Sequence, residues 1–193
     1  APFETAQVND HRIVEIPGAG PDSSYSVFCP EGQAGSAPPA QYLQLLRELP
    51  ARLDPAVIAL ADSVCSAEEA TVAKIAAVAS YFHDNYEYRA GIQVPPGWDP
   101  LTYFLLERPP AHCEYFAAGA AVLLRQGGVP CRYVTGFVVS ERDSIGGEWI
   151  ARNKDAHAWV EAWDDQLGWV IVEATPHHGV PVALKASIER HLG

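Results

Sequence analysis

The chain has 193 residues, of which 48% are hydrophobic, so it is long enough to bury one core of ordinary domain size. Its formal net charge is −11, from 24 acidic and 13 basic residues. A field of this sign repels nucleic acid and anionic membranes, and the basic residues are scattered without a local cluster that would reverse it. We therefore expect no nucleic-acid partner and no membrane contact by this segment itself.

Targeting and metal-binding patterns are missing from the sequence. No apolar run approaches the roughly 18 residues that span a bilayer, and no signal peptide opens the chain. Because the sequence contains no Met, we expect residue 1 to follow processing or excision from a longer protein. The four cysteines form no CxxC pair, so we expect no zinc site and no cofactor. These cysteines are Cys29, Cys65, Cys113 and Cys131.

The composition changes near residue 40. Residues 1–40 are rich in Pro, Gly, Ser and Ala, which predicts an extended arm or the remnant of an upstream β domain. Two strand-like pieces, Arg12–Ile16 and Tyr25–Phe28, lie within it. We expect the folded core to cover 41–180, and residues 181–193 to form a C-terminal tail or linker.

Helical patterns fill the first half of the core. One helix is predicted from Gln41, and a second opens with Pro55 in its first turn. A third is predicted to begin with a capping box formed by Ser66 and Glu69 and to end near Asn85. Its apolar face would consist of Val72, Ile75, Val78, Ala79 and Phe82.

Two further helices and a run of strands follow. Asp99 is expected to cap a short helix, and another helix begins close to Cys113 and ends at about Gln126, before Gly127–Gly128. Beyond Pro130 the pattern predicts strands at about 132–139, 148–152, 156–163 and 169–173. Helices followed by strands indicate an α+β fold.

Cys113 stands at the start of a predicted helix, and that position has a chemical consequence. The partial positive charge and free N–H groups of a helix N-terminus favour thiolate over thiol and can stabilise an oxyanion. The commoner fate of a lone cysteine is to be a small buried hydrophobe. Position alone leaves both interpretations of Cys113 open.

A histidine and a carboxylate are predicted to meet on the last two strands. If residues 164–168 form the hairpin loop with Trp163 opposite Trp169, then His157 lies diagonal to Glu173 on the same side of the sheet. A register slip of one residue would place Glu173 on the opposite face. Together with Cys113, these residues would form a Cys–His–acid set.

Several segments resemble the transglutaminase-like core in order, spacing and surrounding residues, over roughly residues 65–176. They are HCEYFA at 112–117, LLR at 123–125, GVPCRYVTGF at 128–137, DAHAWVE at 155–161, GWV at 168–170 and EATP at 173–176. The chain is also similar to a bacterial subgroup of this superfamily, which carries the His-Cys-Glu-Tyr-Phe-Ala motif and an upstream segment like Gln41–Leu45.

The resemblance implies a papain-like α+β fold, in which N-terminal helices and the nucleophile helix pack on an antiparallel sheet. Residues 41–180 would then form the catalytic core. Cys113 maps onto the nucleophile of the family, His157 onto its base and Glu173 onto its orienting acid. Where the family usually has Asp followed by Pro, this sequence has Glu173 followed by Ala174.

The resemblance also implies an activity. We expect thiol-dependent acyl transfer or hydrolysis on glutamine or peptide-like amides, through a thioester on Cys113. The partner would be a protein or peptide substrate, with an amine as acceptor in the transfer reaction. Tyr115 and Trp159 are the expected substrate contacts. The bacterial subgroup typically carries this domain outside the cytoplasm between membrane helices, which favours a periplasmic domain of a membrane-anchored parent protein.

Three alternatives stay open at this point. A cysteine protease or amidase would use the same residues. A peptide N-glycanase is a relative, but the CxxC zinc pairs often associated with that branch are missing here. A non-catalytic binding module that retains the fold is the third, and the change from Asp to Glu173 is its main support.

Overall fold

The computed structural model describes most of the chain between residues 37 and 176. The described residues are 7–8, 14–15, 37–139, 141–147, 149–176 and 179. The chain divides into two units, Ala1–Ala34 and Gly35–Gly193. In the first unit, β1 (Gln7–Val8) pairs with β2 (Val14–Glu15), which falls within the predicted piece Arg12–Ile16. The predicted piece Tyr25–Phe28 and the tail 181–193 lie outside the described residues.

Five helices are described in the second unit, and their local sequence signals explain where most of them begin. They are α1 (Ala40–Leu45), α2 (Pro55–Cys65), α3 (Thr71–Asn85), α4 (Pro100–Glu107) and α5 (Cys113–Gln126). The side chain of Asp54 accepts a hydrogen bond from the second residue of α2, and that of Asp99 accepts one from the third residue of α4. Proline occupies the first position of both helices, where its missing N–H costs nothing.

The predicted capping box of α3 is wrong. Ser66 lies at the C-terminal end of α2, and α3 begins only at Thr71, after Ala70, without a side-chain cap. Burial of the preceding residue explains the difference: Cys65 is 3% exposed and its thiol donates to the carbonyl of Leu123, so packing extends α2 up to the serine. Val72, assigned to the apolar face, is instead 43% exposed.

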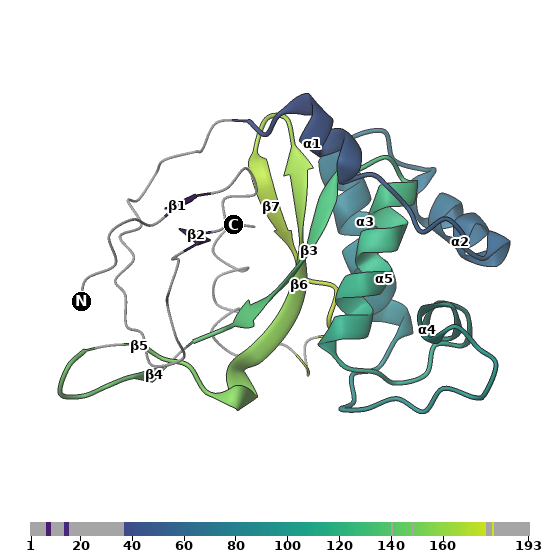
Figure 1. Ribbon diagram of the computed structural model, residues 1–193. Coiled ribbons are helices and arrows are strands. Elements are labelled where there is room, and N and C mark those ends of the chain that lie inside the picture. Colours follow the sequence, from purple (N-terminus) through teal and green to yellow (C-terminus); the bar gives the residue numbers. More distant parts are fainter. Residues whose placement is uncertain are drawn as a thin grey trace. The chain divides into compact units, whose positions relative to one another are not determined.

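The main sheet has three antiparallel strands in the order β3-β6-β7 (Figure 1). They are β3 (Cys131–Phe137), β6 (Ala156–Asp164) and β7 (Gly168–Val172). Trp163 pairs with Trp169, so the predicted hairpin register is confirmed. The strand expected at 148–152 does not join this sheet, because β5 (Trp149–Ile150) pairs only with β4 (Glu141–Arg142) in a separate ribbon. A short 3₁₀ turn, η1 (Asn153–Asp155), then leads into β6.

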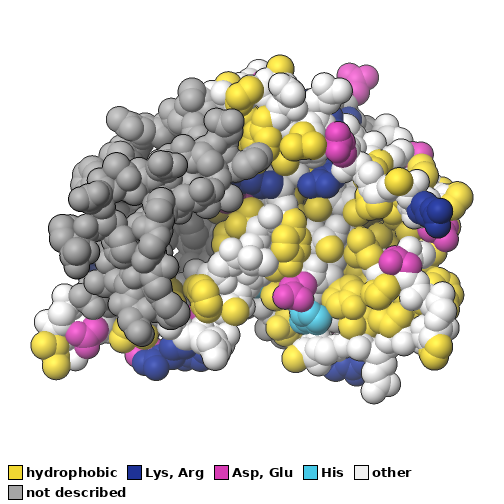
Figure 2. Space-filling model, viewed as in Figure 1, with side chains coloured by type: hydrophobic (Ala, Val, Ile, Leu, Met, Phe, Trp, Pro, Cys, Tyr) yellow, Lys and Arg dark blue, Asp and Glu magenta, His cyan; other side chains and the backbone are white. Residues whose placement is uncertain are grey.

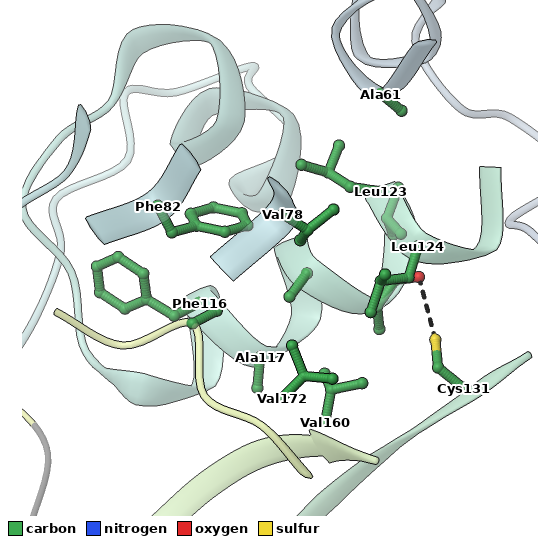
Figure 3. Close-up of a cluster of buried hydrophobic side chains, with 14 of the residues drawn as sticks. Ala61, Val78, Phe82, Phe116, Ala117, Leu123, Leu124, Cys131, Val160 and Val172 are labelled. Atoms are coloured by element: carbon green, nitrogen blue, oxygen red, sulfur yellow. Dashed lines mark hydrogen bonds between the residues drawn. The ribbon is translucent and has the colours of Figure 1, made fainter. Parts of the chain in front are cut away.

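Helix α5 lies at the centre of the core, with the sheet on one side and α2 and α3 on another (Figure 1). Figure 3 shows Phe116 and Ala117 of this helix among Val160 and Val172 of the sheet and Phe82 of α3. Nearly every residue of α5 from Phe116 to Leu124 is buried. This packing fixes the N-terminus of α5 relative to the strands, and the α+β expectation is confirmed.

Candidate active site

Cys113 is the first residue of α5 and is partly exposed. No side chain caps this helix, so N–H groups of its first turn remain available to a ligand or an oxyanion. The loop before it is fixed by backbone hydrogen bonds: Arg89 N–H donates to Ala111 at 2.8 Å, and Ala111 N–H donates to Glu87 at 3.2 Å. The sulfur therefore sits at a helix tip whose approach segment is held in place.

The structure brings His157 and Glu173 together. Nε2 of His157 lies 2.6 Å from Oε2 of Glu173, and the two side chains are 1% and 5% exposed. His157 is the second residue of β6, while Glu173 directly follows the end of β7. The diagonal relationship predicted from the hairpin register is therefore present as a buried hydrogen bond.

A second hydrogen bond orients the carboxylate. Oε1 of Glu173 accepts from the backbone N–H of Thr175 at 2.8 Å. Because both carboxylate oxygens have partners, the extra methylene of Glu relative to Asp is accommodated within a fixed geometry. The role of Thr175 was missed from the sequence; its only signal was a position two residues after an acid, where such local hydrogen bonds form.

The protonation of His157 reflects its neighbours. Burial would lower the pKa of the imidazole, but hydrogen bonds to Cys113 and Glu173 and the negative charges of both groups raise that pKa to about 9. Nε2 of the imidazole faces Glu173, and His157 also interacts with Cys113. An imidazole with a thiol and a carboxylate as neighbours can move a proton to and from sulfur.

Aromatic side chains lie near the histidine and the sulfur. The Trp159 indole lies nearly parallel to the His157 ring, with centroids 6.2 Å apart. The phenols of Tyr88 and Tyr133 lie near the nucleophile, and burial raises the pKa of each, with a further contribution from the negative charge of Cys113. Sequence reasoning named Trp159 but missed both tyrosines, because they come from distant segments.

A cavity of about 410 Å³ opens beside the first turn of α5. Its apolar lining comes from Pro100 and Leu101 of α4, and from Tyr115 and Ala118 of α5. The carboxylates of Asp99 and Glu114, together with the Tyr133 ring, complete it. Of the two residues expected to contact substrate, Tyr115 lines this cavity and Trp159 does not.

Two other cysteines are described, Cys65 and Cys131, and both lie in the core. Cys65 and Cys131 are buried and unpaired, and the Cys131 thiol donates to the carbonyl of Ala121 (Figure 3). Burial raises the pKa of Cys131 to about 11 and also raises that of Cys65. The sequence interpretation of Cys131 as a small buried strand residue is confirmed.

The described residues include neither a metal-binding cluster nor a membrane-spanning helix. No group of three or more His, Cys, Asp or Glu side chains in this part of the chain is arranged to hold a metal ion. Within the same residues, no helix combines the length and the apolar character needed to cross a membrane.

Known proteins resemble this chain over the region just described. A protein-glutamine gamma-glutamyltransferase of Pseudomonas aeruginosa is 33% identical over 147 residues, which cover 75% of this chain and 22% of that protein. A Bacillus subtilis protein, YebA, is 29% identical over 79% of this chain and 21% of its own length. The chain therefore spans about a fifth of these curated relatives.

A solved structure is similar as well. The periplasmic domain of TgpA from Pseudomonas aeruginosa superposes with a TM-score of 0.63 at 30% identity, over 69% of this chain and 46% of that one. The sequence model of the transglutaminase-like superfamily matches residues 58–174, which is more than half of the chain and includes Cys113, His157 and Glu173. The chain belongs to the transglutaminase-like superfamily.

Proposed function

We propose that this chain is a thiol acyl-transfer enzyme, with Cys113 as nucleophile, His157 as proton carrier and Glu173 as orienting acid. The observation that carries the proposal is the environment of the His157 ring, which is hydrogen-bonded to the buried carboxylate of Glu173 and has its pKa raised by Glu173 and Cys113. A histidine with only a structural role would need neither a cysteine at a helix N-terminus nor a buried carboxylate as its neighbour.

The chemistry follows from this geometry. The Cys113 thiolate attacks an amide carbonyl, and the oxyanion that forms faces the free N–H groups of the first turn of α5. His157 gives its proton to the departing amine, leaving a thioester on sulfur. It then takes a proton from the incoming amine or water as that nucleophile attacks the thioester. The carbon–sulfur bond breaks and the thiolate–imidazolium pair is restored.

Glutamine side chains are the substrate class that we propose, with an amine or water as the second reactant. The similarity to a protein-glutamine gamma-glutamyltransferase supports glutamine as acyl donor. Because the similar solved structure is a periplasmic domain, we also propose that this domain works outside the cytoplasm as part of a longer protein.

The test is an amine-incorporation assay with a glutamine-containing donor, run beside an ammonia-release assay that reports hydrolysis. We expect activity in at least one assay, and we expect Cys113→Ala to abolish it. Cleavage of peptide bonds without reaction at glutamine would favour the protease or amidase alternative. If the unmodified protein is inactive in both assays and against peptide bonds, the binding-module alternative replaces the proposal.

A further inference from the structure

The cavity beside Cys113 has a lining that suits a long cationic side chain. Its walls are apolar where Leu101 of α4 and Ala118 of α5 face it, and carboxylates stand at its edge. Lys and Arg side chains bind in this way, because their methylene stems pack on apolar surface while the charged end meets an acid. Among the described residues, no Lys or Arg lines the cavity, and the basic side chain nearest to its acids is His112, beside Glu114.

Each of the two carboxylates keeps an oxygen for a ligand. Oδ1 of Asp99 accepts from the Thr102 backbone N–H, and Oε2 of Glu114 lies 3.1 Å from Nε2 of His112. Among the described contacts, the second oxygen of each side chain has no partner. Figure 2 shows acidic, histidine and hydrophobic side chains gathered on the face of the molecule where the lower end of α5 lies in Figure 1.

The cavity and the nucleophile are neighbours. Glu114 and Tyr115 directly follow Cys113 in the first turn of α5, where each residue advances the helix by about 1.5 Å. Tyr133 forms another wall and lies close to both Glu114 and Cys113, whose negative charges add to the effect of burial in raising its pKa. Because the lining of the cavity begins one residue beyond Cys113 on α5, we expect a side chain one or two residues from the reacting amide to reach it.

We propose that the cavity lined by Leu101, Glu114 and Tyr133 is a specificity subsite that binds a Lys or Arg side chain of the donor peptide, within two residues of the reacting glutamine. Its carboxylates attract the cation, and the Tyr133 ring offers a face for a cation–π contact. This subsite rests on the proposed function, because it presupposes a peptide donor at Cys113. It goes further by stating which donors react fastest.

The test compares matched glutamine peptides in which each flanking position carries either lysine or norleucine, which has the same stem without the charge. We expect kcat/KM for acyl-enzyme formation to favour lysine at one or more positions by about five-fold at low salt. The preference should shrink at 1 M NaCl, where screening acts within about 3 Å. Glu114→Gln should reduce the lysine preference, because only Asp99 then remains to attract the cation.

The control variant is Glu107→Gln, which removes an exposed carboxylate from the end of α4 that does not line the cavity. It should keep the lysine preference. Binding of the same fluorescently labelled peptides to Cys113→Ala separates the two proposals. A lysine preference in binding without turnover by the unmodified protein would leave the subsite standing and overturn the acyl-transfer function. Equal behaviour of lysine and norleucine peptides in both binding and turnover would overturn the subsite alone.

Discussion

The carboxylate of Glu173 is held from two sides, by the His157 ring at 2.6 Å and by the Thr175 backbone N–H at 2.8 Å. Glutamate is one methylene longer than aspartate, and the hydrogen bond from Thr175, two residues further along the chain, holds its carboxylate in place. This pairing explains how a superfamily member with Glu where Asp is usual can still present a carboxylate to its histidine. It also leads to the first prediction.

Replacing Glu173 by Gln keeps the shape of the side chain and removes its charge. The imidazolium then loses its buried counter-charge, so we expect the pKa of His157 to fall and kcat/KM to drop by about 100-fold or more. The alkaline limb of the pH–rate profile should move to lower pH. Steady-state kinetics between pH 6 and 10 measure both effects.

Glu173→Asp is the matched control for that experiment. Aspartate keeps the charge but is one methylene shorter, so we expect it to hold the His157 ring less closely from the present backbone. We expect an activity between those of the unmodified protein and Glu173→Gln. If Asp restores full activity, the hydrogen bond from Thr175 does not position the acid.

The raised pKa of His157 makes stability depend on pH. The folded state binds the proton with a pKa of about 9, against an ordinary value near 6.5. This contribution is therefore complete below about pH 6.5 and is lost as the pH rises through about 9. Urea unfolding should show the free energy of unfolding of the unmodified protein falling toward that of His157→Gln across this range. A difference that stays constant or grows with pH would contradict the prediction.

Among the three cysteines that the structure describes, thiol labelling should single out Cys113. This residue is partly exposed and interacts with His157, whereas Cys65 and Cys131 are buried and have raised pKa values. Under native conditions at pH 7 we expect iodoacetamide to modify the Cys113 peptide fastest, as followed by mass spectrometry, and His157→Ala to slow that reaction. Labelling after denaturation gives the total reactivity of each thiol. Native labelling of Cys131 at a rate similar to Cys113 would contradict the burial.

The parts of the fold that the sequence predicted well depend on local signals. Asp99 and Pro100 define the start of α4, and the glycines after Gln126 define the end of α5. The hairpin register was predictable because the loop length places Trp163 opposite Trp169, and Gly168 takes the positive φ of 77° that its position requires. That register alone brought His157 to Glu173.

The errors and omissions arise where tertiary packing decides. Ser66 had the pattern of a helix start, but burial of Cys65 keeps it at the end of α2. The cavity beside Cys113 is lined by residues of α4 and α5 and by Tyr133 of β3. The spacing of residues along the sequence does not show which part of α4 lies close to β3. Such a site becomes visible only when the elements have been assembled.

Gly136 lies directly opposite His157 in the sheet, and its missing side chain makes room for an aromatic ring. A Cβ at this position would lie 2.9 Å from Cη2 of Trp159, whose indole is nearly parallel to the His157 ring. We expect Gly136→Ala to displace the indole and loosen the imidazole, lowering kcat/KM by roughly 10- to 100-fold while costing about 1–2 kcal/mol of stability.

The control for this change is Thr135→Ala, which alters the exposed neighbouring residue on the opposite face of the strand. It should leave kcat/KM and the thermal midpoint nearly unchanged. An NMR titration of His157 in Gly136→Ala distinguishes two causes of lost activity. If the imidazole is displaced, the pKa of His157 shifts from about 9; if the fold is only less stable, this pKa stays the same. If activity and the titration are both unaffected, Trp159 adapts without disturbing the histidine, and its contact with His157 has no part in positioning the proton carrier.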